Sequence, residues 1–293
     1  MTPPAIGSDL VLPARLAAPP RPTQRHPWLL PVAVRVHRCR RRAAWVRDTV
    51  TSRVRWASRR DEHLLPVHVA EHGSTLLRQL VPEQMDLQHN KVTNLRLAAA
   101  CVDRLVIGPG ETFSFNRVVG NATRRRGFVE GMRLSAGRPV TGVGGGLCQL
   151  ANLLHWLVLH SDLTVVERSE HSVDPFPDDG RVVPWGVGCT IVYNYVDLVV
   201  RNDTTSTFQL RAWVDDAHLH GELLADRAQR RRWAVEAREE EFVRRGAEVF
   251  RRNELWRRAI DPRTGEPLTE ELVKRNCALV LYPLPAGAVV RDV

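Results

Sequence analysis

The sequence predicts an α+β protein in which helices come first and a mostly antiparallel sheet follows. Apolar residues recur at helical spacing in segments before residue 160, and beyond it they alternate with polar residues, as in strands. The composition, 43% hydrophobic and 26% charged, is that of a folded globular chain. A length of 293 residues is enough for one or two domains.

The amino-terminal region differs from the rest in composition and charge. Residues 1–34 are rich in proline and are predicted to be a disordered arm. Residues 35–62 are predicted to form a basic amphipathic helix, with the clearest periodicity over 35–60. Its apolar stripe is formed by Val36, Cys39, Ala43, Val46, Val50, Val54 and Ala57. Two interpretations remain open: the stripe packs on the body, or it makes peripheral contact with an anionic membrane or an acidic partner.

The net charge of +9 is concentrated in this region. The first 60 residues hold 13 of the 42 Lys and Arg but 2 of the 33 Asp and Glu. Because the basic charge is confined to one end and no stacking aromatics interleave with it, nucleic-acid binding is not predicted. Five scattered cysteines without a Cys-x-x-Cys pair indicate a reducing compartment. No membrane span or secretory signal is visible, so we expect a cytoplasmic or membrane-peripheral protein.

The main domain is predicted over residues 63–285, with a core at 88–225 and a β-rich extension at 226–285. Helices are expected at 88–105, which Gly108-Pro109-Gly110 follows, and at 147–160, the most strongly amphipathic segment. Residues 116–147 are expected to be loops with one short strand. The expected strands are 112–115, 164–168, 190–201, 207–214, 218–224, 233–237 and 248–258.

Cys148 is the residue most suggestive of chemistry. Gly144, Gly145 and Gly146 precede it and allow a tight turn that a ligand can approach. Cys148 then lies in the first turn of the helix, where unpaired N–H groups and the helix dipole favour a thiolate and lower its pKa. Papain-like and transglutaminase-like enzymes present a cysteine in this way, so a similar outline is predicted. The same helix start also suits binding of a carboxylate or phosphate without any reaction.

A thiolate enzyme needs a base and a residue that orients it. We select His171 as the base, Asp197 as the orienting acid and Gln149 as an oxyanion donor. His155 is a second candidate base. His218 and His220 lie on one strand face, but no third ligand is expected beside them, so neither a metal site nor a cofactor is predicted.

Several ungapped blocks, in this order, resemble the VanW family of bacterial proteins. They are HNKVTNL at 89–95, PGETFSFN at 109–116, VG at 119–120, RGF at 126–128, GGGLCQ at 144–149, ERxxHS at 167–172 and DLxxxN at 197–202. The segment 174–197, with its PFPD and YNYVD, is similar to the members found in glycopeptide-resistance operons. Many relatives carry an Asp in the block where this chain has Gly188-Cys189-Thr190. If that Asp is catalytic in them, either Asp197 fills its role here or no reaction occurs.

The resemblance implies a role in vancomycin resistance and in cell-envelope or peptidoglycan metabolism, but no particular reaction. Glu111, Asn116 and Ser172 lie in its blocks and join the three glycines as candidate ligand-binding residues. Three hypotheses follow. The chain is a cysteine-dependent hydrolase or transferase acting on a peptidoglycan-precursor-like substrate, a non-catalytic binding module for an anionic cell-wall or lipid-linked ligand, or an accessory scaffold that contacts other proteins through residues 35–60.

Overall fold

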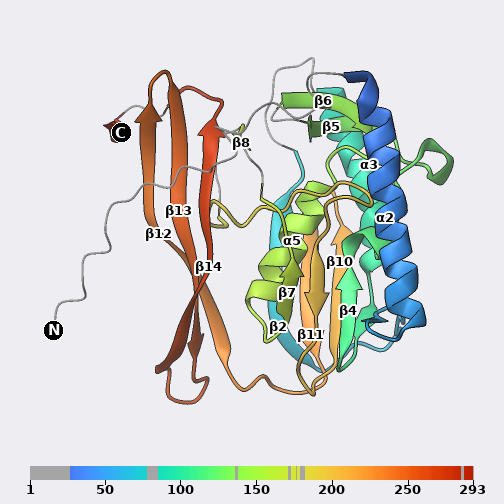
Figure 1. Ribbon diagram of the computed structural model, residues 1–293. Coiled ribbons are helices and arrows are strands. Elements are labelled where there is room, and N and C mark those ends of the chain that lie inside the picture. The colour runs from blue at the N-terminus through green and yellow to red at the C-terminus, as the bar shows by residue number, and fades with distance from the viewer. Residues whose placement is uncertain are drawn as a thin grey trace.

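Two layers of secondary structure stand side by side in the computed structural model, which describes residues 27–77, 85–135, 138–170, 173–175, 177–178, 182–284 and 287–292. Long strands form one edge of the molecule, and helices packed on shorter strands form the other (Figure 1). The sheets are mostly antiparallel. The predicted α+β class is therefore confirmed, and the papain-like or transglutaminase-like outline stays a prediction.

The body contains the helices and two four-stranded sheets. One sheet has the order β1-β4-β9-β7 and the other β2-β11-β10-β3, while β5 and β6 form a separate hairpin. The helices are α2 (Leu30–Val50, after the 3-10 turn Pro27–Leu29), α3 (Met85–Val102), α4 (Phe115–Val119) and α5 (Cys148–Leu159), with a 3-10 turn at Arg124–Arg126. The strands are β1 (Arg55–Trp56), β2 (Val67–Thr75), β3 (Leu105–Ile107), β4 (Glu111–Ser114), β5 (Glu130–Ser135), β6 (Arg138–Val143), β7 (Thr164–Glu167), β9 (Val199–Arg201), β10 (Phe208–Val214) and β11 (His218–Ala225).

The core lies where α3 and α5 pack on the sheet that contains β10 and β11. Both helices bury an apolar face, with Leu95, Ala98 and Val102 on α3. On α5, Leu153 and Leu157 lie so close to Gly221 of β11 that a Cβ there would come within 3.0 Å of each side chain. A glycine in β11 therefore sets how closely α5 approaches the sheet.

The long sheet is the carboxyl-terminal extension. Its order is β15-β12-β13-β14-β8, with β8 (Val173–Asp174), β12 (Arg232–Arg245), β13 (Glu248–Ile260), β14 (Pro267–Val280) and β15 (Val290–Asp292). The strands predicted at 233–237 and 248–258 exist, and they are longer than expected. A small apolar cluster of Leu159, Val187 and Leu255 joins this sheet to the end of α5. The extension thus packs directly against the helix that carries Cys148.

Helix α2 departs from the sequence prediction in its bounds and in its orientation. It begins at Leu30, inside the predicted arm, and ends at Val50 because Ser52 adopts a positive φ of 52°. Residues 1–26 of that arm lie outside the described residues. The apolar stripe faces away from the body: Val46 and Val50 are 62% and 77% exposed. The interpretation that the stripe packs on the body is therefore wrong for its helical part, whereas Ala57, beyond the end of the helix, is buried in the core.

The opposite face of α2 makes the contacts instead. The guanidinium of Arg41 donates to Glu167 at 2.6 Å, and that of Arg38 lies over the ring of Tyr193. Ion pairs and ring stacking orient the helix more specifically than a row of Val and Ala can. In the described residues, no helix is both long and apolar enough to cross a lipid bilayer.

Two further predictions, one of loops and one of a strand, are also corrected. The region 116–147 contains α4, a 3-10 turn and the hairpin β5–β6 rather than one short strand. In the predicted strand 190–201, only β9 is a strand, because the chain turns back on itself at 192–196. The side chain of Asn116 donates to the carbonyls of Val192 and Val196 and so stabilises this turn, in which Asn194 has a φ of 53°.

Candidate functional site

The glycine run before α5 is packed against protein on its Cβ side. A Cβ on Gly145 would lie 2.1 Å from the carbonyl carbon of Gly131, and one on Gly146 would lie 2.1 Å from Cγ of Lys91. The side chain of Asn94 on α3 donates to the carbonyl of Gly145 at 2.9 Å. These glycines allow α3, β5 and the start of α5 to approach one another closely. Their role as ligand-binding residues stays a prediction.

A stripe of polar side chains on α5 holds the extended segment 187–191. The carbonyl of Val187 accepts from Nδ1 of His155 at 2.8 Å, and the N–H of Cys189 donates to Oδ1 of Asn152 at 2.6 Å. The main chain of Ile191 hydrogen-bonds to Cys148. Cys148, Asn152 and His155 are spaced by four and three residues, so they lie on one face of α5. Their partners in the segment are spaced by two. Each turn of α5 therefore provides a hydrogen-bond partner for one main-chain group of a segment that belongs to no sheet.

Burial raises the pKa of the Cys148 thiol, although the hydrogen bond from Ile191 acts in the opposite direction. The expectation of a lowered pKa is therefore wrong, because desolvation of the thiolate outweighs the helix start. Burial likewise raises the pKa of the neighbouring Cys189 to about 12. The pKa of His155 falls to about 3, through burial and then the charge of Arg168, so this imidazole is neutral and structural at physiological pH.

His171 and Ser172 lie outside the described residues. The residues before them run beside the segment that α5 holds: the N–H of Thr190 donates to the carbonyl of Ser169, and the guanidinium of Arg168 donates to the carbonyl of Gly188. The pairing of His171 with Cys148 therefore stays a prediction.

Asp197 is almost fully buried and has several partners, as expected for an acid at an apolar position. Its carboxylate accepts from Oγ of Ser114 at 2.5 Å, from the N–H of Asn116 at 2.9 Å and from Arg41 at 3.4 Å. Burial raises the pKa of Asp197, while the donors from Ser114 and Asn116 lower it. None of its hydrogen bonds to described residues involves α5. In this arrangement Asp197 joins β4, α4 and α2.

Two other candidates also make structural contacts. The side-chain amide of Gln149 donates to Oγ of Ser74 and to the carbonyl of Thr75, at the end of β2. The carboxylate of Glu111 accepts from the N–H of Gly108 at 2.8 Å. Both side chains are engaged within the fold, and a second role for either stays a prediction.

His218 and His220 do have a third potential ligand nearby. The carboxylate of Asp215 lies within 4.8 Å of both imidazoles and contacts Nε2 of His220 at 2.6 Å. The expectation that no third ligand lies close is wrong, because the tight turn at 215–217 brings this acid back to the strand. Asp215 also accepts from the N–H groups of Ala217 and His218, and these bonds account for its position in the turn.

The carboxyl end of α5 opens into a hollow of about 420 Å³ between β2 and β12. Trp156 comes from α5 and His160 from the residue just after it, with their ring centroids 4.3 Å apart. Arg231, Arg232 and Trp233 face them from the start of the extension. Hollows of this size at the junction of two units, with aromatic walls and a few charged groups, are typical of small-ligand sites.

Two arginines and one carboxylate, Glu71, line this hollow, so its lining carries a net positive charge. Burial lowers the pKa of His160, and burial, followed by the proximity of His160, lowers the pKa of His72 beside it. Arg231 pairs with Asp162 at 2.9 Å, whereas the exposed side chain of Arg232 forms no ion pair or hydrogen bond with any described residue. The neighbouring strand β2 adds His68, which contacts Glu71 at 3.4 Å.

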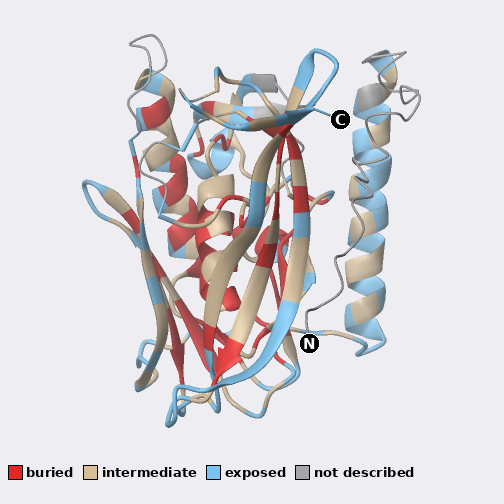
Figure 2. Cartoon of the chain, turned by 90° about the vertical axis from the view of Figure 1, so that its left-hand side faces the viewer, coloured by how far each residue is buried: buried red, intermediate tan, exposed pale blue. Residues whose placement is uncertain are grey.

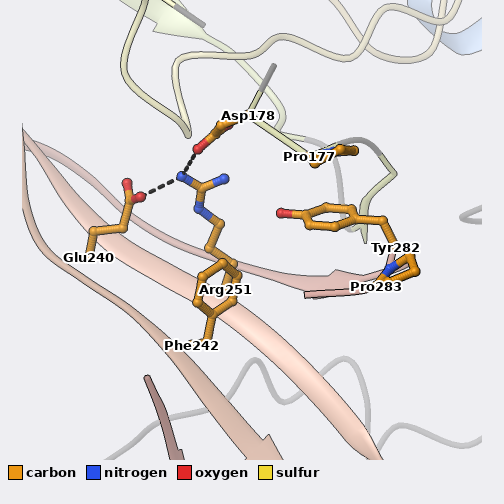
Figure 3. Close-up of a pocket in the computed structure, with 7 residues that line it drawn as sticks. All are labelled: Pro177, Asp178, Glu240, Phe242, Arg251, Tyr282 and Pro283. Atoms are coloured by element: carbon orange, nitrogen blue, oxygen red, sulfur yellow. Dashed lines mark hydrogen bonds and ion pairs between the residues drawn. The ribbon is translucent and has the colours of Figure 1, made fainter. Parts of the chain in front are cut away.

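A second hollow of about 400 Å³ lies where residues 177–178 meet β12 and β13 (Figure 3). Its cation, Arg251, is buried and already bonded to Asp178 and Glu240, with Asp174 at 3.5 Å. Tyr282 donates to Asp174 at 2.9 Å, and burial raises the pKa of this phenol to about 12. Because three carboxylates surround this one guanidinium, the hollow offers no free cation to an anionic ligand. The contacts of Arg251 instead connect the extension to residues 174 and 178.

Sequence reasoning did not find the residues of the first hollow. Trp156 and His160 follow Cys148 by eight and twelve residues, but Arg231, Arg232 and Trp233 lie about 70 residues farther along the chain. Only the packing of the extension on α5 brings them together. The one signal in the sequence is a Trp next to consecutive arginines at 230–233.

Comparison with known proteins gives a consistent result. The family model described as VanW like protein matches residues 90–224, which include all of α5. The chain is 33% identical over 272 residues to the vancomycin B-type resistance protein VanW of Enterococcus faecalis, covering 93% of this chain and 98% of that protein. It is 40% identical over 96 residues to the uncharacterized protein YoaR of Bacillus subtilis, covering 32% of each. No solved structure matches the chain.

Proposed function

Since the chain belongs to the VanW family, we propose that it acts in vancomycin resistance by binding an anionic, peptide-like cell-wall ligand. The resistance role is supported by the name of the Enterococcus faecalis relative, which aligns with nearly the whole chain. The observation that carries the binding role is the hollow at the carboxyl end of α5, with two tryptophans and two arginines around it.

Each part of this hollow suits one part of such a ligand. The guanidinium of Arg232 is a donor for a carboxylate, with which arginine forms paired hydrogen bonds, and Arg231, which is paired with Asp162, adds positive charge beside it. The rings of Trp156 and Trp233 offer apolar walls for short aliphatic side chains. Cell-wall stem peptides combine these features, because they carry small side chains and end in a carboxylate.

The competing hypothesis is a thiol hydrolase or acyltransferase. In it, Cys148 attacks an amide or ester carbonyl, His171 takes the thiol proton, Asp197 orients the imidazole and Gln149 stabilises the oxyanion. The raised pKa of Cys148 and the engaged side chains of Gln149 and Asp197 argue against this arrangement. The third hypothesis, an accessory scaffold that acts through the amino-terminal helix, assigns no role to the hollow.

The test is a calorimetric titration of the full chain with a stem peptide that has a free carboxyl terminus, and with the same peptide as its terminal amide. We expect the carboxylate form to bind more tightly. The double variant R231Q/R232Q should weaken binding about tenfold or more, because a hydrogen bond to a charged group contributes about 1.5–3 kcal/mol.

A matched control is R125Q/R245Q, which neutralises two exposed arginines that are far in sequence from every residue lining the hollow. Equal affinity of the two double variants, or no difference between acid and amide, would refute the proposed site. Peptide cleavage or transfer by the wild type that Cys148→Ala abolishes would instead support the enzyme.

A further inference from the structure

The outward face of α2 carries an apolar stripe that nothing in the described body covers. Its residues, Val32, Val36, Cys39, Ala43, Val46 and Val50, are all exposed and are spaced alternately by four and three. At 3.6 residues per turn this spacing keeps them on one side of the helix. Figure 2 shows α2 at the periphery of the molecule, with exposed residues along its length.

Arginines border the stripe on both sides. Arg35 and Arg42 lie along one border and Arg40 and Arg47 along the other, and all four are exposed. The side chains of Arg35, Arg40 and Arg42 form no ion pair or hydrogen bond with any described residue, whereas Arg47 pairs with Asp48. Trp28, 72% exposed, lies in the turn just before the helix. An apolar strip between two rows of cations, with a Trp near one end, is the pattern of helices that lie in a membrane interface.

From this arrangement we infer that the outer face of α2 binds the surface of an anionic lipid bilayer. The cations contribute most of the attraction, since Val, Ala and Cys insert only a small apolar area. Each arginine close to an anionic surface strengthens binding by a factor of about five. The stripe then lets the helix lie flat with its arginines at the level of the headgroups.

A second copy of the chain fits this face less well. Two such faces packed together would place the bordering arginines of one helix beside those of the other, and like charges at that distance repel. A surface with many negative charges complements all four arginines at once.

The inner face of α2 explains how the helix can bind a membrane without leaving the body. Arg41 contacts Glu167 and Asp197, and the guanidinium of Arg117 lies over the rings of Trp45 and Trp56. These contacts use side chains opposite the stripe, so bilayer binding and docking on the body do not compete. The hollow beside α5 uses none of these residues, and the two proposals are independent.

The experiment is sedimentation of the full chain with vesicles of phosphatidylglycerol and phosphatidylcholine, and with vesicles of phosphatidylcholine alone. We expect binding to the anionic vesicles only, weakening as salt is added. The variant R35Q/R40Q/R42Q should bind roughly 100-fold more weakly. Its matched control, R230Q/R245Q/R263Q, removes the same charge from exposed arginines elsewhere and should bind like the wild type.

A second variant tests the stripe itself. Val46→Asp should weaken vesicle binding, whereas Val289→Asp, at another exposed valine, should not. Equal loss with the two triple variants would overturn the proposal. So would a concentration-dependent dimer, seen by sedimentation velocity without lipid, that Val46→Asp dissociates, because the stripe would then bind a second copy.

Discussion

The two ends of helix α5 differ in their surroundings: one end is bonded to other parts of the protein, and the other borders an open hollow. At the amino end, Cys148 and Asn152 hydrogen-bond to an extended segment, and the preceding glycines pack against neighbouring main chain and a lysine. At the carboxyl end, Trp156 and His160 border an open hollow that the extension completes with arginines. The motif of glycines and Cys148 thus contributes to packing, although it contains a reactive residue type. The proposed ligand site lies instead where the body meets the extension.

The largest effect is expected at the glycine run. Gly145→Ala should lower the free energy of unfolding by more than about 3 kcal/mol, because the new Cβ meets the main chain of Gly131, which cannot rotate away. Gly246→Ala is the control: its positive φ costs about 1 kcal/mol, but no atom lies within 4 Å of the added methyl. Chemical denaturation measures both. A small, equal loss in the two variants would mean that the amino end of α5 is not tightly packed.

Acidification should lower the free energy of unfolding through the buried imidazole of His155 on the same helix. The folded pKa of His155 is about 3, below the ordinary value of 6.5, so the unfolded chain binds the proton first. Stability is therefore complete above about pH 6.5 and falls as the pH drops toward 3, by ~1.4 kcal/mol per pH unit for this group. The lowered pKa values of His72 and His160 act in the same direction.

The variant His155→Asn isolates this contribution. Its unfolding free energy, measured from pH 7 to pH 4, should fall less steeply than that of the wild type, whereas His89→Gln, at an exposed histidine, should keep the wild-type slope. Identical slopes for His155→Asn and the wild type would show that folding does not shift the pKa of His155.

At the open end, Trp156→Ala should weaken binding of the carboxylate-ended stem peptide about tenfold or more, because it removes one apolar wall. Trp213→Ala, which truncates a partly exposed Trp on β10 outside the hollow, should leave the affinity unchanged. Calorimetry gives both values. Similar losses would locate the ligand elsewhere.

The sequence predicted the order of the elements better than the site. Helix α5 and strands β10 and β11 were located within one or two residues, because each has a clear period and a nearby turn. The turn at 192–196 was missed, since it depends on the side chain of Asn116, about 80 residues away. Cys148 suggested a thiolate because the helix start is visible in the sequence, whereas the burial that raises its pKa is not.

The smallest effect is expected at the cysteine. Cys148→Ala should cost about 1 kcal/mol of stability, the contribution of one hydrogen bond, and should leave peptide affinity unchanged. Cys148→Ser should do the same, because a hydroxyl also accepts from Ile191. Loss of ligand binding in both variants would move the functional site to the amino end of α5.

The most direct test of this difference is competitive alkylation of the intact protein near pH 7, with the modified cysteines identified by mass spectrometry. Cys39 on the outer face of α2 is exposed and serves as an internal standard. Cys148 should react roughly tenfold or more slowly than Cys39, since burial keeps its thiol protonated. Alkylation of Cys148 ahead of Cys39 would contradict the account, because it would reveal an accessible thiolate at the start of α5.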